Sequence, residues 1–131
     1  MRRFVVAIIL DPQRRMLMGR RNDSDKWTNP AGSCNEGEDA HLAMAREIKE
    51  ETGLDTKEMK LVHCGMNRRG NLIYLFLCRV TGKIDTSQDP DEECSDWSFE
   101  NPFAKLSELH VPLEDNHAVA WYSQHLDELN Q

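Results

Sequence analysis

Residues 32–54 read GSCNEGEDAHLAMAREIKEETGL and bring three glutamates, Glu47, Glu50 and Glu51, close together. Residues 38–52 contain no proline or glycine and are rich in residue types that favour helix. At about 100° per residue, the three side chains fall within an arc of roughly 100° on such a helix. The segment therefore predicts a helix with one acidic face, preceded by a loop that contains Gly32.

The ends of this helix carry their own signals. Asn35, with Glu38 three residues later, resembles a capping box, a pair of side chains that bond to backbone N–H groups at the start of a helix. Gly53 is placed to take the left-handed conformation that ends a helix. Met44 and Ile48 lie on a different side from the glutamates, so we expect that side to face the core.

An acidic helix face is most often only a solvated surface. Against that interpretation, like charges three and four residues apart destabilise a helix by roughly a few tenths of a kcal/mol each. Only Arg46, four residues before Glu50, offsets them locally. A divalent cation among the carboxylates would remove the repulsion, and a cation held in this way is suited to chemistry on phosphates.

The segment resembles the signature of the Nudix hydrolases, G-x5-E-x7-R-E-U-x-E-E-x-G-U, where U is an aliphatic residue. The chain is similar to a short, MutT-like member of that family. Every specified position of the signature is matched, by Gly32, Glu38, Arg46, Glu47, Ile48, Glu50, Glu51, Gly53 and Leu54.

The resemblance implies an α/β fold, the Nudix α/β/α sandwich, in which a mixed β-sheet lies between helices. The hydrophobic pattern alone indicates only a small α+β or α/β domain. At 131 residues we expect one domain, 1–131. The expected strands are 4–10, 15–19, 59–66, 72–80 and 94–99, with a short extended piece at 27–32 and a second helix at 112–129. The first two strands would form a hairpin, and a turn at 67–71 would join the next two.

The resemblance also implies an enzyme that hydrolyses a phosphoanhydride bond and uses Mg²⁺, with Mn²⁺ as an alternative. By resemblance, Arg46 and Glu38 hold the loop and orient the ligating glutamates, and Gly32 and Gly53 shape the motif. The backbone carbonyl of Ala31 would add a ligand, although the family commonly has a glycine there. The metal ligands would then be Glu47, Glu50, Glu51 and Ala31.

Family members differ in which residue acts as the general base. The candidates here are Glu50 and Glu51 in the motif, and Glu92 or Glu93 in the later loop at 86–93. The acidic run in that loop is more often a solvated turn, so both interpretations stay open. With Arg46 as the orienting group, the catalytic set we predict is Glu50, Glu51, Arg46 and Glu93.

Substrate contacts are less specific in the sequence. Arg20 and Arg21, ahead of a polar loop, could bind phosphates through paired hydrogen bonds, or could be surface charges at a strand end. Trp27 and Tyr74 are among the aromatic residues that could stack on a base, and buried aromatic residues usually pack in the core.

By resemblance, the leading activity is hydrolysis of a nucleoside triphosphate to a monophosphate and pyrophosphate. The alternatives are an ADP-ribose or dinucleoside polyphosphate hydrolase, and a nucleotide sensor without activity. The proline associated with ADP-ribose hydrolases would fall at Gly70, and Tyr74 lies too late for the dinucleoside polyphosphate group. Removal of pyrophosphate from an RNA 5′ end is a further alternative, for which Arg68 and Arg69 could form a local basic patch.

Composition excludes some partners and suggests a setting. The net charge of −7 argues against general nucleic-acid binding, which requires a basic surface. No apolar run approaches a membrane span, and the apolar start of the chain is better explained by a strand than by a signal peptide. The four cysteines form no C-x-x-C pair, which indicates reduced thiols and a cytoplasmic location. A small-molecule nucleotide is the expected partner, and an exposed edge strand would allow a homodimer.

Overall fold

A computed structural model of the chain describes residues 1–89 and 92–129. These residues form seven strands, two α-helices and two short 3-10 helices. In chain order the elements are β1 Arg3–Ile9, β2 Met16–Arg21, β3 Trp27–Thr28, β4 Ala31–Ser33, α1 Ala40–Thr52, β5 Asp55–Met66, β6 Leu72–Thr81, β7 Cys94–Glu100, η1 Pro102–Glu108, η2 Leu113–Asp115 and α2 His117–Leu129.

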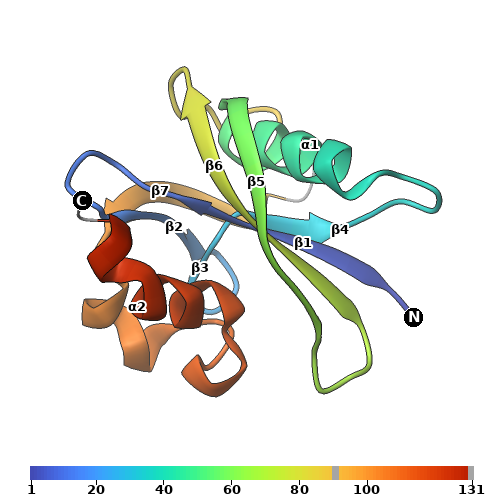
Figure 1. The fold of residues 1–131 in the computed structure, drawn as a ribbon. Helices are drawn as coiled ribbons and strands as arrows, with labels where there is room; N and C mark the ends of the chain where they lie inside the picture. Colours follow the sequence, from blue (N-terminus) through green and yellow to red (C-terminus); the bar gives the residue numbers. More distant parts are fainter. Residues whose placement is uncertain (90–91, 130–131) are drawn as a thin grey trace.

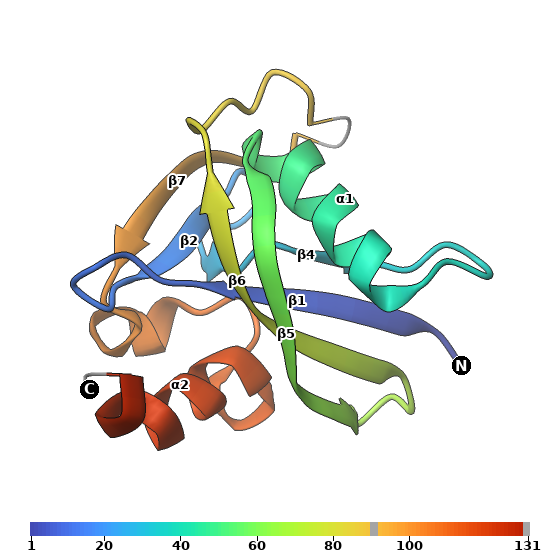
Figure 2. The same ribbon diagram turned by 45° about the horizontal axis from the view of Figure 1, so that its top comes forward.

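The strands lie between the two α-helices, with α1 on one side and α2 on the other (Figures 1 and 2). This arrangement confirms the predicted α/β/α sandwich. The strands divide into two sheets, a four-stranded one in the order β4-β1-β6-β5 and a three-stranded one in the order β3-β2-β7. The larger sheet is mixed, because β1 and β6 run parallel while the other neighbours are antiparallel.

Alternating side chains of the central strands supply a separate core under each helix. On β1, Val5 and Ala7 belong to the core that contains Met44 and Ile48 of α1. Ile8 points the other way, into the core beneath α2. A strand buried on both faces reads as a continuous apolar run, which explains the pattern at the start of the chain.

The predicted hairpin of the first two strands is wrong. β2 pairs with β3 and β7 in the smaller sheet, and a single bridge between Leu10 and Met16 links it to the end of β1. The physical reason is that both edges of β1 are already taken, by β4 on one side and β6 on the other. A short turn after β1 therefore carries the chain from one sheet to the other.

Other boundaries differ by shorter lengths. The predicted strand at 59–66 begins earlier, at Asp55, and η1 falls in a stretch for which we predicted no element. The predicted helix at 112–129 begins at His117, because the backbone N–H of Val119 donates to the side chain of Asn116, at 3.0 Å, and so caps the helix there. Of the loop predicted at 86–93, residues 90–91 lie outside the described residues.

Candidate active site

The helix α1 is capped at both ends by its own sequence. At its start, the side chain of Asp39 accepts a hydrogen bond from the backbone N–H of His41. Asn35 and Glu38, the predicted cap, lie instead in the preceding loop, where the backbone N–H of Asn35 donates to Glu38 at 2.9 Å. At its end Gly53 has a φ of 79°, the left-handed conformation that the sequence predicts. The caps fix where the acidic residues of the helix lie.

Arg46 is the centre of the acidic cluster. Its guanidinium binds both carboxylate oxygens of Glu38, each at 2.9 Å, and donates to Glu47 at 2.9 Å and to Glu50 at 3.3 Å. It also donates to the backbone carbonyl of Ser33 on β4, at 3.1 Å. The hydrogen bonds from Arg46 are the main cause that lowers the pKa of Glu38 to about 2. Arg46 therefore ties the helix to the loop, as the sequence predicts.

Gly32 leaves room for Glu47, whose carboxyl group lies directly against it. A Cβ atom added at Gly32 would collide with the carboxyl group of Glu47. Gly32 is also paired with Val5 in the sheet, so its backbone has little room to withdraw. Because Gly32 has no side chain, the carboxyl group of Glu47 on α1 can contact the backbone of β4.

Glu51 is the buried member of the acidic cluster. Its side chain is 6% exposed, and its Oε1 atom accepts a hydrogen bond from the backbone N–H of Ala31 at 3.4 Å. The Oε2 atom is buried and has no hydrogen-bond partner among the described residues. Burial raises the pKa of Glu51 well above its ordinary value, and the neighbouring Glu47 raises it further. Burial also raises the pKa of Glu47. In this state the two carboxyl groups favour holding a proton.

These residues fit a hard divalent cation such as Mg²⁺ or Mn²⁺. An unpaired, buried carboxylate oxygen is costly, and a cation would pair with it. Glu47 and Glu50 have oxygens engaged by Arg46, and within residues 1–89 and 92–129 no three His, Cys, Asp or Glu side chains form a ready metal cluster. The ligand set Glu47, Glu50, Glu51 and Ala31 stays a prediction, and ligation by Glu47 and Glu50 would require their bonds to Arg46 to change.

Glu93 and Arg21 lie on the same side of the molecule as the motif carboxylates. Burial is the main cause of the raised pKa of Glu51, and the negative charge of Glu93 also contributes, which indicates that the two are near each other. Arg21 lies 3.7 Å from Glu93 and binds Asp23 more closely, at 2.9 Å. Arg21 is thus partly neutralised, but it remains beside the predicted base.

The other predicted substrate contacts are not gathered at the motif. Trp27 is 8% exposed and packs in the core beneath α2. The guanidinium of Arg20 lies 5.6 Å and the Nζ atom of Lys105 4.7 Å from the centre of its ring, so cations cover the indole. Tyr74 is half-buried and packs against the core on the α1 side. The structure therefore gives Arg20, Trp27 and Tyr74 packing contacts of their own.

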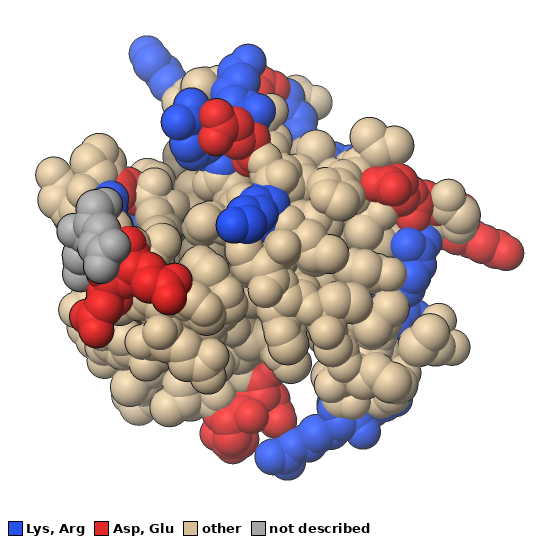
Figure 3. All heavy atoms as spheres, viewed as in Figure 1, with Lys and Arg blue, Asp and Glu red and all other residues tan. Residues whose placement is uncertain are grey.

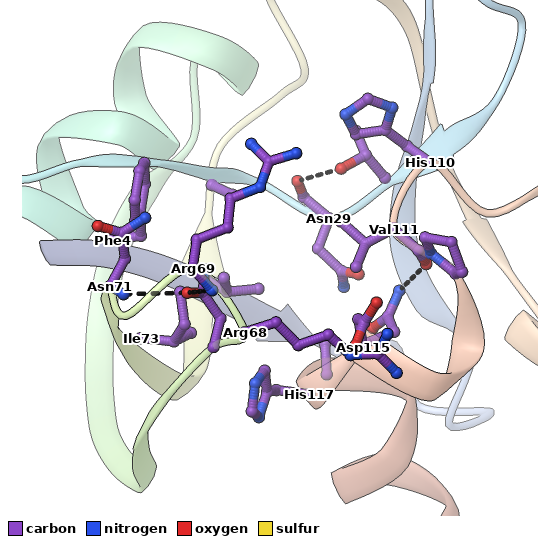
Figure 4. A pocket seen from close by; sticks show the side chains of 17 residues that line it. Phe4, Asn29, Arg68, Arg69, Asn71, Ile73, His110, Val111, Asp115 and His117 are labelled. Carbon is purple, nitrogen blue, oxygen red and sulfur yellow. Dashed lines mark hydrogen bonds and ion pairs between the residues drawn. The ribbon is translucent and has the colours of Figure 1, made fainter. Parts of the chain in front are cut away.

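A pocket of about 470 Å³ opens on the α2 side of the larger sheet, and the sequence did not predict it (Figure 4). Phe4, Val6 and Ile73 supply apolar surface from the sheet. The turn at 67–71 and the segment at 110–118 supply its walls. The basic pair of the turn was the one signal in the sequence, since the walls come from segments far apart in the chain.

Ala31 belongs to both the pocket and the acidic cluster. It lines the pocket, and its backbone N–H binds Glu51. A ligand in the pocket therefore lies next to β4, and Glu47 and Glu51 of α1 contact this same strand.

A family model of the NUDIX domain matches residues 1–123. The chain belongs to the Nudix hydrolase family. It is 31% identical over 98 residues to Nudix hydrolase 10 of Arabidopsis thaliana, covering 71% of this chain and 35% of the relative. It is 36% identical over 93 residues to mouse 8-oxo-dGDP phosphatase NUDT18, covering 68% of this chain and 29% of that protein. The chain thus spans about a third of the length of these two Nudix relatives.

Solved Nudix structures share the fold. An ADP-ribose pyrophosphatase from Streptococcus suis superposes with a TM-score of 0.75 at 23% sequence identity, covering 99% of this chain and 92% of that one. At this identity the likeness shows the fold alone, and it confirms the predicted Nudix fold. Among the described residues of this Nudix chain, no helix is long and apolar enough to cross a membrane.

Proposed function

We propose that this chain hydrolyses a phosphoanhydride bond in a derivative of a nucleoside diphosphate, with a nucleoside triphosphate as the leading substrate. The observation that carries the proposal is the buried, unpaired Oε2 atom of Glu51, held beside Glu47 and next to Ala31. A carboxylate in this state calls for a cation, and Ala31 also lines a pocket of suitable size for a small organic group.

The pocket and the acidic cluster suit different parts of such a substrate. The apolar surface and neutral polar side chains of the pocket would receive the nucleoside. The phosphates would extend past Ala31 toward the carboxylates. The relative named 8-oxo-dGDP phosphatase and the fold neighbour named ADP-ribose pyrophosphatase both bear the names of nucleoside diphosphate compounds. These names support the substrate class without choosing among its members.

In the mechanism we propose, Glu47, Glu50, Glu51 and the carbonyl of Ala31 hold Mg²⁺ or Mn²⁺. When bound, such an ion neutralises phosphate charge and lowers the pKa of water. Arg46, fixed by Glu38, orients the glutamates that it contacts. A carboxylate takes a proton from the attacking water as the new O–P bond forms, and the bridging P–O bond breaks to release pyrophosphate and a monophosphate.

Four carboxylates remain candidates for the base, Glu50 and Glu51 in the motif and Glu92 and Glu93 in the later loop. Glu50 is partly exposed and is held by Arg46 at 3.3 Å, whereas Glu93 approaches from the loop before β7, near Arg21. Glu51 is the most buried, which suits a ligand better than a group that must exchange protons with solvent. We therefore place the base at Glu93, or at Glu50 if Glu50 does not bind the metal ion.

The test is a substrate panel with Mg²⁺ at mildly alkaline pH. It contains ordinary and oxidised nucleoside triphosphates, ADP-ribose, dinucleoside polyphosphates and a triphosphorylated RNA, with products separated by ion exchange. We expect turnover of one class, release of a monophosphate, and complete loss of activity in EDTA. Metal-independent turnover would contradict the mechanism, and tight nucleotide binding without turnover would favour the sensor alternative.

A further inference from the structure

The turn between β5 and β6 presents two adjacent arginines from a fixed backbone. The side chain of Asn67 accepts hydrogen bonds from the backbone N–H groups of Arg69 and Asn71, both at 3.0 Å. Gly70 has a φ of 79°, which other residues rarely adopt, and its N–H bonds to the carbonyl of Asn67. Arg68 and Arg69 therefore leave the turn from defined positions.

The charge of Arg68 is neutralised by Asp115, which lies on another wall of the pocket. Its Nε atom lies 2.8 Å from a carboxylate oxygen of Asp115 in η2, so the pair joins the turn to the segment before α2. In the space-filling view, basic side chains at the end of the β5–β6 hairpin and acidic side chains beside it lie around a hollow (Figure 3). The one carboxylate that lines the pocket, among the described residues, is thus already paired.

Arg69 lines the same pocket without such a partner. Its side chain extends from the turn across the pocket toward the side where Asn29 and His110 lie (Figure 4). Within the described part of the chain, no carboxylate forms an ion pair with it, although the protein has a net charge of −7. An unpaired guanidinium in a hollow of an acidic protein is a local attraction for anions.

The remaining polar groups of the pocket do not cancel this charge. The side chain of Asn29 is 5% exposed, and its amide nitrogen is held by the carbonyl of Ala7 at 3.2 Å. Burial lowers the pKa of both His110 and His117, which favours their neutral forms. The pocket therefore combines apolar surface, neutral polar groups and one positive charge.

We propose that Arg69 is a specificity-determining residue that binds a second anionic group of the substrate, a phosphate ester on its organic part. This proposal rests on the proposed function, because it takes the pocket as the site of that organic part. A guanidinium can bind two phosphate oxygens at once, so it selects phosphate by geometry as well as by charge. The preferred substrates would carry this phosphate on the nucleoside itself or on a sugar linked to it.

The test measures binding in EDTA by titration calorimetry on the full chain, so hydrolysis plays no part. The probes are adenosine and guanosine, each compared with its 3′-monophosphate, and ribose compared with ribose 5-phosphate. We expect the added phosphate to raise affinity about tenfold in the unmodified protein, and the two sets of probes distinguish which source of phosphate the pocket takes. This gain should shrink as salt concentration rises.

The variants assign the gain to one side chain. In Arg69→Ala the phosphate advantage should fall below about twofold, and Arg69→Lys should keep part of it. Lys60→Ala removes the same charge from exposed β5 outside the pocket, so it should keep the full advantage. Because each result is a ratio of two ligands on one variant, a general loss of stability would not imitate it.

Three results would overturn the proposal: a phosphate advantage that survives Arg69→Ala, equal binding with and without phosphate in the unmodified protein, or no binding of any probe at millimolar concentration. If the protein hydrolyses no compound of the substrate panel but still binds the phosphorylated probes more tightly, only the proposed function is contradicted. If the protein hydrolyses a compound of the panel but binds the probes equally well with and without phosphate, only the role of Arg69 is contradicted.

Discussion

The two faces of the larger sheet differ in how their charges are arranged. On the α1 face, the acidic residues and Arg46 form one connected set, built from a single stretch of 23 residues. On the α2 face, the pocket is assembled from segments far apart in the chain, and Arg69 stays without an ion-pair partner among the described residues. Under the two proposals above, the α1 face serves the reaction and the α2 face serves recognition.

Changing Glu51 should have the largest effect in a test of whether the two faces have separate roles. Glu51→Gln keeps the shape of the side chain but removes its charge, so we expect kcat to fall at least about a hundredfold while nucleoside binding to the pocket stays unchanged. Turnover and calorimetry would check this, with Glu36→Gln in the exposed loop as the control. Near-normal turnover would remove Glu51 from the reaction.

The base can be located by comparing two carboxylates of the same face. Of Glu50→Gln and Glu93→Gln, we expect one to slow the chemical step about a hundredfold, the usual range for a lost general base, and the other to have a smaller effect. Single-turnover rates measured against pH would separate them. Glu92→Gln tests the other glutamate of the loop, and it leaves the bond from Asn22 in place because that bond goes to the backbone carbonyl of Glu92. Equal, small effects in both would return the role to Glu51.

Gly32→Ala tests whether the α1 face depends on close contact with β4. The new methyl group would collide with the carboxyl group of Glu47, so we expect about a tenfold loss of turnover and a destabilisation of roughly 1–3 kcal/mol. Ser33→Ala on the same strand keeps the carbonyl that Arg46 uses, and it should change neither quantity. Unchanged activity in Gly32→Ala would mean that the position of Glu47 is not critical.

The stability of the metal-free protein should depend on pH through Glu51. Its pKa is raised in the folded state, so the folded chain holds the proton more tightly than the unfolded one, and stability falls as pH rises above the ordinary value of 4.5. The pKa of Glu38 is lowered in the folded state, so its contribution to stability is lost in the other direction, as pH falls from 4.5 toward about 2. Thermal unfolding in EDTA at pH 6 and pH 9 should show the fall, and Glu51→Gln should reduce it strongly, leaving the smaller part that is due to Glu47. A slope that persists undiminished in the variant would point to another group.

The smallest expected effect concerns the α2 face. Asp115→Asn breaks the ion pair with exposed Arg68, and such pairs contribute about 1 kcal/mol or less, so we expect KM to change less than about fivefold and kcat to stay the same. Asp127→Asn, which removes a similar charge from exposed α2, is the control. A large loss of kcat would show that the two faces are not separate in function.

Sequence reasoning worked best where neighbours in the chain are neighbours in space. The helix α1, its end at Gly53 and the contacts of Arg46 with Glu38 all follow from residues within one short segment. It predicted the strand β2 but not its pairing, because the occupation of both edges of β1 by β4 and β6 cannot be seen locally. The pocket was missed for the same reason, since Phe4 and His117 meet only through the fold.

Some local signals also had two physical solutions. Asn35 with Glu38 keeps one half of the predicted capping box, because Glu38 accepts the bond from the backbone N–H of Asn35, but α1 begins after Asp39, which caps it instead. Trp27 shows that an aromatic residue near a motif is not thereby exposed, since cations of Arg20 and Lys105 cover its ring.

The shared position of Ala31 has a consequence for the products. If the organic part of a substrate is seated on one side of this residue and the carboxylates lie on the other, the bond that is cut is chosen by its distance from the seated group. The strand β4 then fixes this distance, so compounds with longer or shorter phosphate chains should be cut at the same distance from the nucleoside.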